Sequence, residues 1–92
     1  MSPRKWAFLS SHGVVLLEVS RTPNATVRDL AERAQLTERQ AHRVLADLVE
    51  EGYVTRERVG RRNQYRVNYD ASMRLPNFAT HPVRELLDAL GR

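Results

Sequence analysis

The sequence predicts a mainly α-helical fold with a small antiparallel β-hairpin, on three observations. Apolar residues recur at helical spacing in four segments between residues 6 and 90. The spacing changes to a period of two after residue 52, and the turn-forming segment Gly60-Arg61-Arg62-Asn63 interrupts this second pattern. A chain of 92 residues has room for one core, so we expect a single domain over residues 1–92.

The first predicted helix covers residues 6–19, which are dense in large apolar side chains. Its weakest part runs from Ser10 to Gly13, because polar residues and a glycine lower the helix propensity. The helix ends before Pro23, since proline disfavours the helical conformation in the residue that precedes it.

Two shorter helices follow within residues 26–52. Thr26 with Asp29, and Thr37 with Gln40, have the spacing of a capping box, in which each side chain accepts a hydrogen bond from the other residue's backbone N–H. Apolar residues at helical spacing follow each box, and only a short joint separates the two helices. We therefore interpret residues 26–52 as a helix-turn-helix.

Residues 53–69 alternate apolar and polar side chains on both sides of Gly60-Arg61-Arg62-Asn63. This pattern predicts a two-stranded hairpin with an arginine-rich tip, which we call the wing. A lone hairpin is marginally stable in water, so it must pack against the helices. Helices in this order, followed by such a hairpin, predict a winged helix-turn-helix, in which one helix enters the major groove of DNA and the wing contacts the backbone or minor groove.

The last part of the chain contains a connector and one more helix. Residues 70–79 lack a clear period and contain Pro76, which predicts an extended segment. A helix within residues 81–91 begins at His81-Pro82, since proline suits a first helical turn. Its apolar stripe consists of Val83, Leu86, Leu87 and Leu90. We expect this stripe and the N-terminal helix, within residues 5–20, to form a homodimer; the alternative is that the last helix folds back on its own domain.

The positive charge is concentrated in the predicted wing. Residues 55–66 contain five arginines and one glutamate, so their net charge of +4 equals that of the whole chain. Clustered arginines fit phosphate oxygens and displace counterions from nucleic acid. The clustered arginines are Arg56, Arg58, Arg61, Arg62 and Arg66, which marks the wing as a candidate contact with the phosphate backbone of nucleic acid.

The second helix of the helix-turn-helix has a face that suits the reading of base edges. If Ala41, Leu45 and Leu48 face the core, the outward face begins with side chains that can hydrogen-bond to bases. These candidate DNA-binding residues are Arg39, Gln40, His42 and Arg43. In the alternative interpretation Arg39 and Arg43 pair with carboxylates such as Asp47 in an ordinary surface arrangement.

Several function classes are excluded or disfavoured. The chain has no cysteine, and its three histidines lack the spacing of metal ligands, so we expect no metal site and no cofactor. No catalytic constellation or phosphate-binding loop is present, so we do not expect an enzyme. The longest apolar run is too short for a membrane span, and we expect a cytoplasmic protein.

The stretch VRDLAERAQLTERQAHRVLADLVEEGYVTRERVGRRNQYRV resembles the winged-helix regulators of the broad MarR and ArsR type, especially a group of short ArsR-like prokaryotic regulators. The resemblance covers residues 5–69, and RLPNFATHPVRELLDAL is more loosely similar to the group's C-terminal helix. Gln35 stands where the turn often has glycine, and a left-handed backbone there would cost about 1–2 kcal/mol. The cysteine sites of metal-sensing ArsR proteins are absent, so metal response is not carried over.

The resemblance implies a transcription regulator that binds double-stranded DNA at promoters, as a homodimer on a palindromic operator. The contact residues that it implies are Arg39, Gln40, His42 and Arg43 in the major groove and Arg58, Arg61, Arg62 and Asn63 in the wing. An alternative from another class is a winged-helix adaptor that binds proteins and not DNA. Binding of RNA or single strands is disfavoured, because Tyr53, Tyr65 and Tyr69 occupy core positions of the hairpin rather than an exposed stacking surface.

Overall fold

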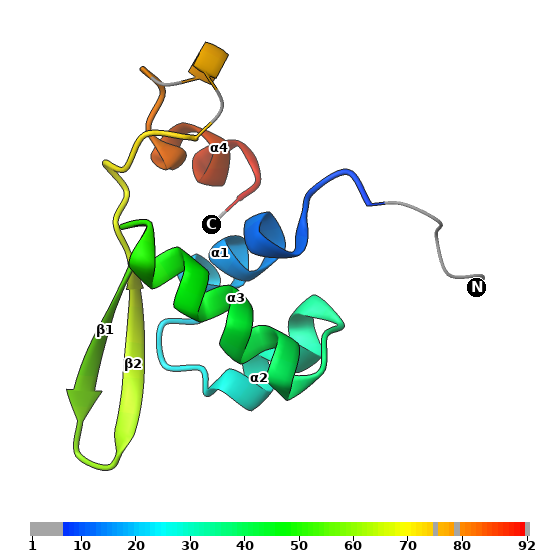
Figure 1. Ribbon diagram of the computed structural model, residues 1–92, viewed down its shortest axis with the longest axis vertical. Helices are drawn as coiled ribbons and strands as arrows, with labels where there is room; N and C mark the ends of the chain where they lie inside the picture. Colours follow the sequence, from blue (N-terminus) through cyan, green and yellow to red (C-terminus); the bar gives the residue numbers. More distant parts are fainter. Residues whose placement is uncertain (1–6, 75, 79, 92) are drawn as a thin grey trace.

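The computed structural model describes residues 7–74, 76–78 and 80–91. Its elements, in chain order, are α1 (Ser11–Arg21), α2 (Val27–Ala34), α3 (Glu38–Glu50), β1 (Val54–Val59), β2 (Arg62–Val67), the short 3₁₀ helix η1 (Pro76–Phe78) and α4 (Val83–Ala89). In Figure 1, α1, α2 and α3 form one packed group, and the hairpin extends from it in the direction away from α4. This arrangement confirms the predicted winged helix-turn-helix.

The first helix begins later than predicted. Ser10 is its N-cap, and the Ser10 hydroxyl accepts the backbone N–H of Gly13 at 3.2 Å. The helix therefore starts within the polar stretch that was expected to weaken it. Serine stabilises a helix as its N-cap but is unfavourable in the helix interior. The described residues before Ser10 are not helical, and Trp6 lies outside the described residues.

The core lies where the three N-terminal helices meet the base of the hairpin and one face of α4. Its buried side chains are Val15, Leu16, Leu17, Val19, Leu30, Val44, Leu45, Leu48, Tyr53, Val54, Tyr65, Val83 and Leu87. The inward face predicted for α3 is confirmed, since Ala41, Leu45 and Leu48 are at most 5% exposed. Burial of this continuous apolar surface orients α3 with its polar face outward.

Both capping boxes of the helix-turn-helix are formed. The Thr26 and Thr37 hydroxyls each accept a backbone N–H at 3.1 Å, from Asp29 and Gln40 respectively. Between the helices, Gln35 takes a left-handed conformation with φ 57° and ψ 44°. It is the only non-glycine residue with positive φ among the described residues.

The hairpin pairs Val54 with Val67 at its base and Val59 with Arg62 at its tip. Its turn is shorter than the four residues predicted, because only Gly60 and Arg61 lie between the strands. Gly60 has φ +63°, and a positive φ at the first central position alone is typical of a type II′ hairpin turn. Such a turn matches the twist of the strands, so Arg62 and Asn63 belong to β2.

The connector is less extended than predicted. Ser72 forms an isolated β-bridge with Pro82, and Pro76 begins η1, since the fixed φ of proline suits a first turn. The Tyr53 hydroxyl donates to the Ser72 carbonyl at 2.8 Å and ties the connector to the core. Burial raises the pKa of Tyr53.

The apolar stripe of α4 is divided between two environments. Val83 and Leu87 are 2% and 1% exposed and belong to the chain's own core, so the prediction that all four residues face a partner is corrected. A helix of seven residues packed on one side buries the residues of one face only, which leaves Leu86 half-buried and Leu90 exposed. Within the described ranges, no helix has the length and apolar character needed to cross a bilayer.

Candidate nucleic-acid interface

The first two turns of α3 present polar side chains to solvent. Arg39, His42 and Arg43 are exposed, whereas their neighbours Ala41 and Val44 are buried. The helix packing therefore brings the predicted base-reading side chains to one face. This face can accommodate hydrogen-bond acceptors such as N7 and O6 of guanine, which arginine contacts through two N–H groups.

Gln40 has a structural role at the start of the same helix. Its amide oxygen Oε1 accepts the backbone N–H of Thr37 at 2.9 Å, while its own N–H donates to the Thr37 hydroxyl. The side chain is exposed, but its direction is set by this capping box. Any contact that Gln40 makes with a base would use its amide nitrogen.

The arginines fall into two groups according to their partners. Of the twelve that the structure describes, six lie within 4.0 Å of a carboxylate. These paired arginines are Arg21, Arg28, Arg33, Arg66, Arg74 and Arg84. The other six have no carboxylate partner among the described residues, and all lie on α3 or the hairpin: Arg39, Arg43, Arg56, Arg58, Arg61 and Arg62.

Two carboxylates at the C-terminal end of α3 have partners other than the arginines of that helix. Asp47, proposed above as an alternative partner of Arg39 and Arg43, instead contacts His12 Nε2 of α1 at 2.8 Å. Glu51, just after the helix, pairs with Arg74 at 3.3 Å. The arginines of α3 therefore lie in its first half, whereas its later part carries Asp47 and Glu50, and Glu38 is the one acidic residue of its first turn.

The wing residues are held by hydrogen bonds to the backbone. Arg58 Nε donates to the Gly60 carbonyl at 3.3 Å, and Arg62 donates to the Asn24 carbonyl in the loop between α1 and α2. Because a backbone carbonyl has no net charge, both guanidinium groups keep their positive charge. Arg61 is exposed at the turn, and Asn63, opposite Arg58 in the hairpin register, is half-buried.

Three residues near this surface were not among the predicted site residues. Arg56 lies two positions from Arg58 on the same strand, so the two side chains share one face of the hairpin, which the alternation of the sequence could have indicated. Asn24 and Gln64 are joined by a hydrogen bond of 3.1 Å between side chains 40 residues apart. No local sequence signal marks such a contact.

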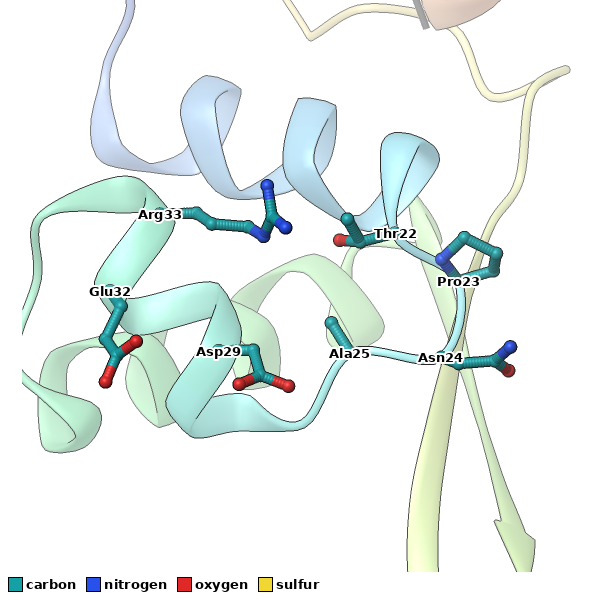
Figure 2. Close-up of a pocket in the computed structure, with 7 residues that line it drawn as sticks. All are labelled: Thr22, Pro23, Asn24, Ala25, Asp29, Glu32 and Arg33. Atoms are coloured by element: carbon teal, nitrogen blue, oxygen red, sulfur yellow. The ribbon is translucent and has the colours of Figure 1, made fainter.

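A hollow of about 600 Å³ lies beside this surface, between the end of α1 and α2. Figure 2 shows Arg33 extending from α2 across the hollow towards α1, where it lies 3.9 Å from Glu18. Asp29 is engaged in the capping box of α2, and its hydrogen bond with the Thr26 backbone N–H lowers the pKa of that carboxyl. Because Arg33 and Asp29 already serve the protein itself, we assign no ligand to this hollow.

Comparison with known proteins places the chain in a family. A sequence model of the MarR family matches residues 9–62, which is more than half of the chain and includes α1, the whole helix-turn-helix and β1. A comparison with curated proteins gives no match. Proteins of the matched family are transcription regulators rather than enzymes. The fold and this match together show that the chain belongs to the MarR family.

Proposed function

We propose that this regulator binds double-stranded DNA in a sequence-specific manner. The N-terminal half of α3 enters the major groove, where Arg39, His42 and Arg43 contact base edges. Gln40 contributes through its amide nitrogen. The wing lies along the backbone or minor groove, with Arg58, Arg61, Arg62 and Asn63 as its contact residues.

The main support for this proposal is which arginines have a carboxylate partner and which do not. An ordinary charged surface would distribute ion pairs over all its arginines, whereas here every arginine without a carboxylate partner among the described residues lies on α3 or the wing. An arginine with no carboxylate partner keeps its full charge for phosphate oxygens or guanine. The acidic end of α3 would be repelled by phosphates, so it supports insertion of the helix by its N-terminal half.

The proposal includes a homodimer and a cytoplasmic location. Two copies related by a two-fold axis would place two recognition helices about 34–36 Å apart, one turn of DNA, on a palindromic operator. Because Val83 and Leu87 are buried, the interface would use the half-buried Leu86 of α4 and the exposed Leu90 that follows it, with residues near the start of α1. Promoter DNA of a prokaryotic cell is reached in the cytoplasm.

Fluorescence anisotropy tests the proposal. The protein is titrated with a duplex from the upstream region of its own gene and with a scrambled duplex, each at several salt concentrations. We expect preference for the upstream duplex and an affinity that falls steeply with salt, by about 0.9 logarithmic units per tenfold salt for each phosphate contact.

A matched pair of variants makes the test specific. The double variant Arg39→Ala, Arg43→Ala should lose the preference for the upstream duplex, because it removes two side chains that face the bases. Arg74→Ala serves as the control, since this arginine is also exposed but pairs with Glu51 and lies on the connector. If the unmodified protein binds neither duplex at low salt, the DNA-binding proposal is wrong and the protein-binding adaptor becomes the leading hypothesis.

A further inference from the structure

The outer half of the wing lacks apolar support. Val54 and Tyr65 are buried at the base of the hairpin, but every residue from Thr55 to Arg62 is exposed. An isolated two-stranded hairpin is at best marginally stable, and nothing in its own sequence fixes the angle at which it leaves the helices. Other contacts must therefore hold the direction of the tip.

Asn24 provides such contacts from the loop between α1 and α2. Its backbone carbonyl accepts a hydrogen bond from the Arg62 guanidinium, and its side-chain oxygen Oδ1 accepts one from Gln64 Nε2 at 3.1 Å. Arg62 and Gln64 are alternate residues of β2, so both side chains emerge on the same face of the hairpin. One loop residue thus holds the strand at two points.

The loop that carries Asn24 is itself firmly placed. The Ala25 N–H donates to the Thr22 carbonyl at 3.0 Å, which closes a β-turn with Pro23 at its first central position. Proline presets the backbone of this position, and the Thr22 hydroxyl anchors the turn by donating to the Glu18 carbonyl of α1. Figure 2 shows the Asn24 side chain directed away from the hollow, on the side where β2 passes.

We propose that Asn24 is a positioning residue that sets the direction of the wing relative to α3. The inference rests on the proposed function, because the wing and α3 must reach the same duplex together. A fixed angle lowers the conformational entropy that binding would otherwise cost. Asn24 itself needs no contact with DNA in this role.

The proposal also changes how Arg62 is interpreted. Its guanidinium has five N–H donors, and the bond to the Asn24 carbonyl uses one of its terminal nitrogens. Arg62 can hold the wing and attract a phosphate at the same time. Replacement of Arg62 therefore mixes two effects, and the uncharged pair of Asn24 and Gln64 gives the cleaner test.

The experiment measures the direction of the wing in the free protein and its affinity for duplex DNA. Residual dipolar couplings of the amides in residues 55–66 report the orientation of the hairpin relative to the helices. In Asn24→Ala and Gln64→Ala, which remove the side-chain bond but keep the Arg62 bond to the Asn24 backbone carbonyl, these couplings should become smaller in magnitude, while those of α1 to α3 stay unchanged. Duplex affinity should fall about fivefold, the effect of one hydrogen bond of ordinary net strength, with an unchanged salt slope.

Two controls complete the design. The double variant Asn24→Ala, Gln64→Ala should be no weaker than either single variant, because both remove the same hydrogen bond. Asn68→Ala loses a side-chain bond of the same kind, to the Gly52 carbonyl at the hairpin base, and should leave the couplings at the tip unchanged.

The outcomes separate this inference from the proposed function. Unchanged hairpin couplings and affinity in Asn24→Ala and Gln64→Ala would overturn the positioning role. A reduced salt slope in these variants would overturn it as well, since it would indicate a lost phosphate contact. Failure of the unmodified protein to bind any duplex would contradict the proposed function, whereas the couplings, measured without DNA, would still decide whether Asn24 orders the wing.

Discussion

Gln35 adopts a left-handed backbone conformation that is unfavourable for a residue with a side chain. Its left-handed conformation brings the Leu36 N–H to the Ala31 carbonyl at 2.9 Å, which satisfies the end of α2 and redirects the chain into α3. For a residue with a Cβ atom this conformation costs about 1–2 kcal/mol. The angle between α2 and α3 is therefore maintained by packing and capping, against a local preference.

Replacing Gln35 with glycine should stabilise the protein. Glycine removes the steric cost but makes the unfolded chain more flexible, so the net gain in the free energy of unfolding should be about 1 kcal/mol. Thermal unfolding followed by circular dichroism should show a midpoint about 4–8 °C higher for Gln35→Gly. Gln35→Ala keeps the Cβ atom and is the control without gain; a lower midpoint for Gln35→Gly would show that the Gln35 side chain contributes more than its strain.

Arg43 and Arg61 should differ in what their loss does to DNA binding. Arg43 lies on the face of α3 proposed to read bases, so Arg43→Ala should cost about 1–3 kcal/mol at the cognate site and little on a scrambled duplex. Arg61, at the tip of the wing, should contribute equally on all duplexes. Arg61→Ala should reduce the salt slope by about one unit.

Anisotropy titrations of both variants on both duplexes check this division. Equal losses from the two variants on every duplex would contradict it. The comparison is fair because both arginines are exposed and neither has a carboxylate partner among the described residues.

At the scale of single elements, the capping box of α2 makes the stability of that helix depend on pH. The Thr26 N–H donates to Asp29 at 3.1 Å, and this bond keeps the pKa of Asp29 below its ordinary value of 3.8. The folded state thus favours the ionised carboxylate. The stabilising effect is complete above the unfolded pKa and is lost as the pH falls through the lower, folded pKa.

In Asp29→Asn, the free energy of unfolding should therefore depend less on pH in the acidic range. Asparagine retains an oxygen that can accept the Thr26 N–H but does not titrate in this range. Urea unfolding of both proteins between pH 6 and pH 2 measures the difference. The advantage of the unmodified protein should be constant above about pH 4, near the reference pKa of an aspartate, and disappear below it; a difference that persists unchanged at the lowest pH would contradict the role of the carboxylate.

The elements themselves were largely readable from the sequence, because their signals are local. The threonine caps of α2 and α3 and the change of period at Gly52 each lie within a few residues. The errors occurred where local signals compete. Ser10 is a poor interior helix residue but a good cap, so the first helix starts beside it, and Gly60 alone supplies the positive φ that the hairpin turn needs.

At the scale of the whole molecule, the candidate site was only partly predictable. The sequence shows where arginines cluster, but their partners depend on contacts between distant segments. Glu18 lies near Arg33 and His12 contacts Asp47 only because α1 crosses the other two helices. Hence the sequence could not indicate that α3 and the wing hold all of the described arginines without carboxylates, or that Asn24 meets β2.

At the scale of the whole molecule, the small core also favours association of two copies of the chain. Leu90 is 37% exposed and Leu86 is half-buried, and α4 lies at the far end of the molecule from the wing (Figure 1). An interface there would leave both wings and both recognition helices available to one duplex. It would also bury apolar surface that a chain of this size has difficulty covering alone.

Charge on this face should therefore separate two copies without unfolding either. We expect the unmodified protein to sediment as a dimer, and the double variant Leu86→Glu, Leu90→Glu to sediment as a folded monomer, with far-ultraviolet circular dichroism unchanged. Its affinity for a palindromic duplex should fall to that for a single half-site, because the second recognition helix is no longer linked to the first. Val59→Glu changes a residue that is 51% exposed on the wing and should leave the association state unchanged. A monomeric unmodified protein, or a dimer that survives the double variant, would show that this face of α4 does not join two copies.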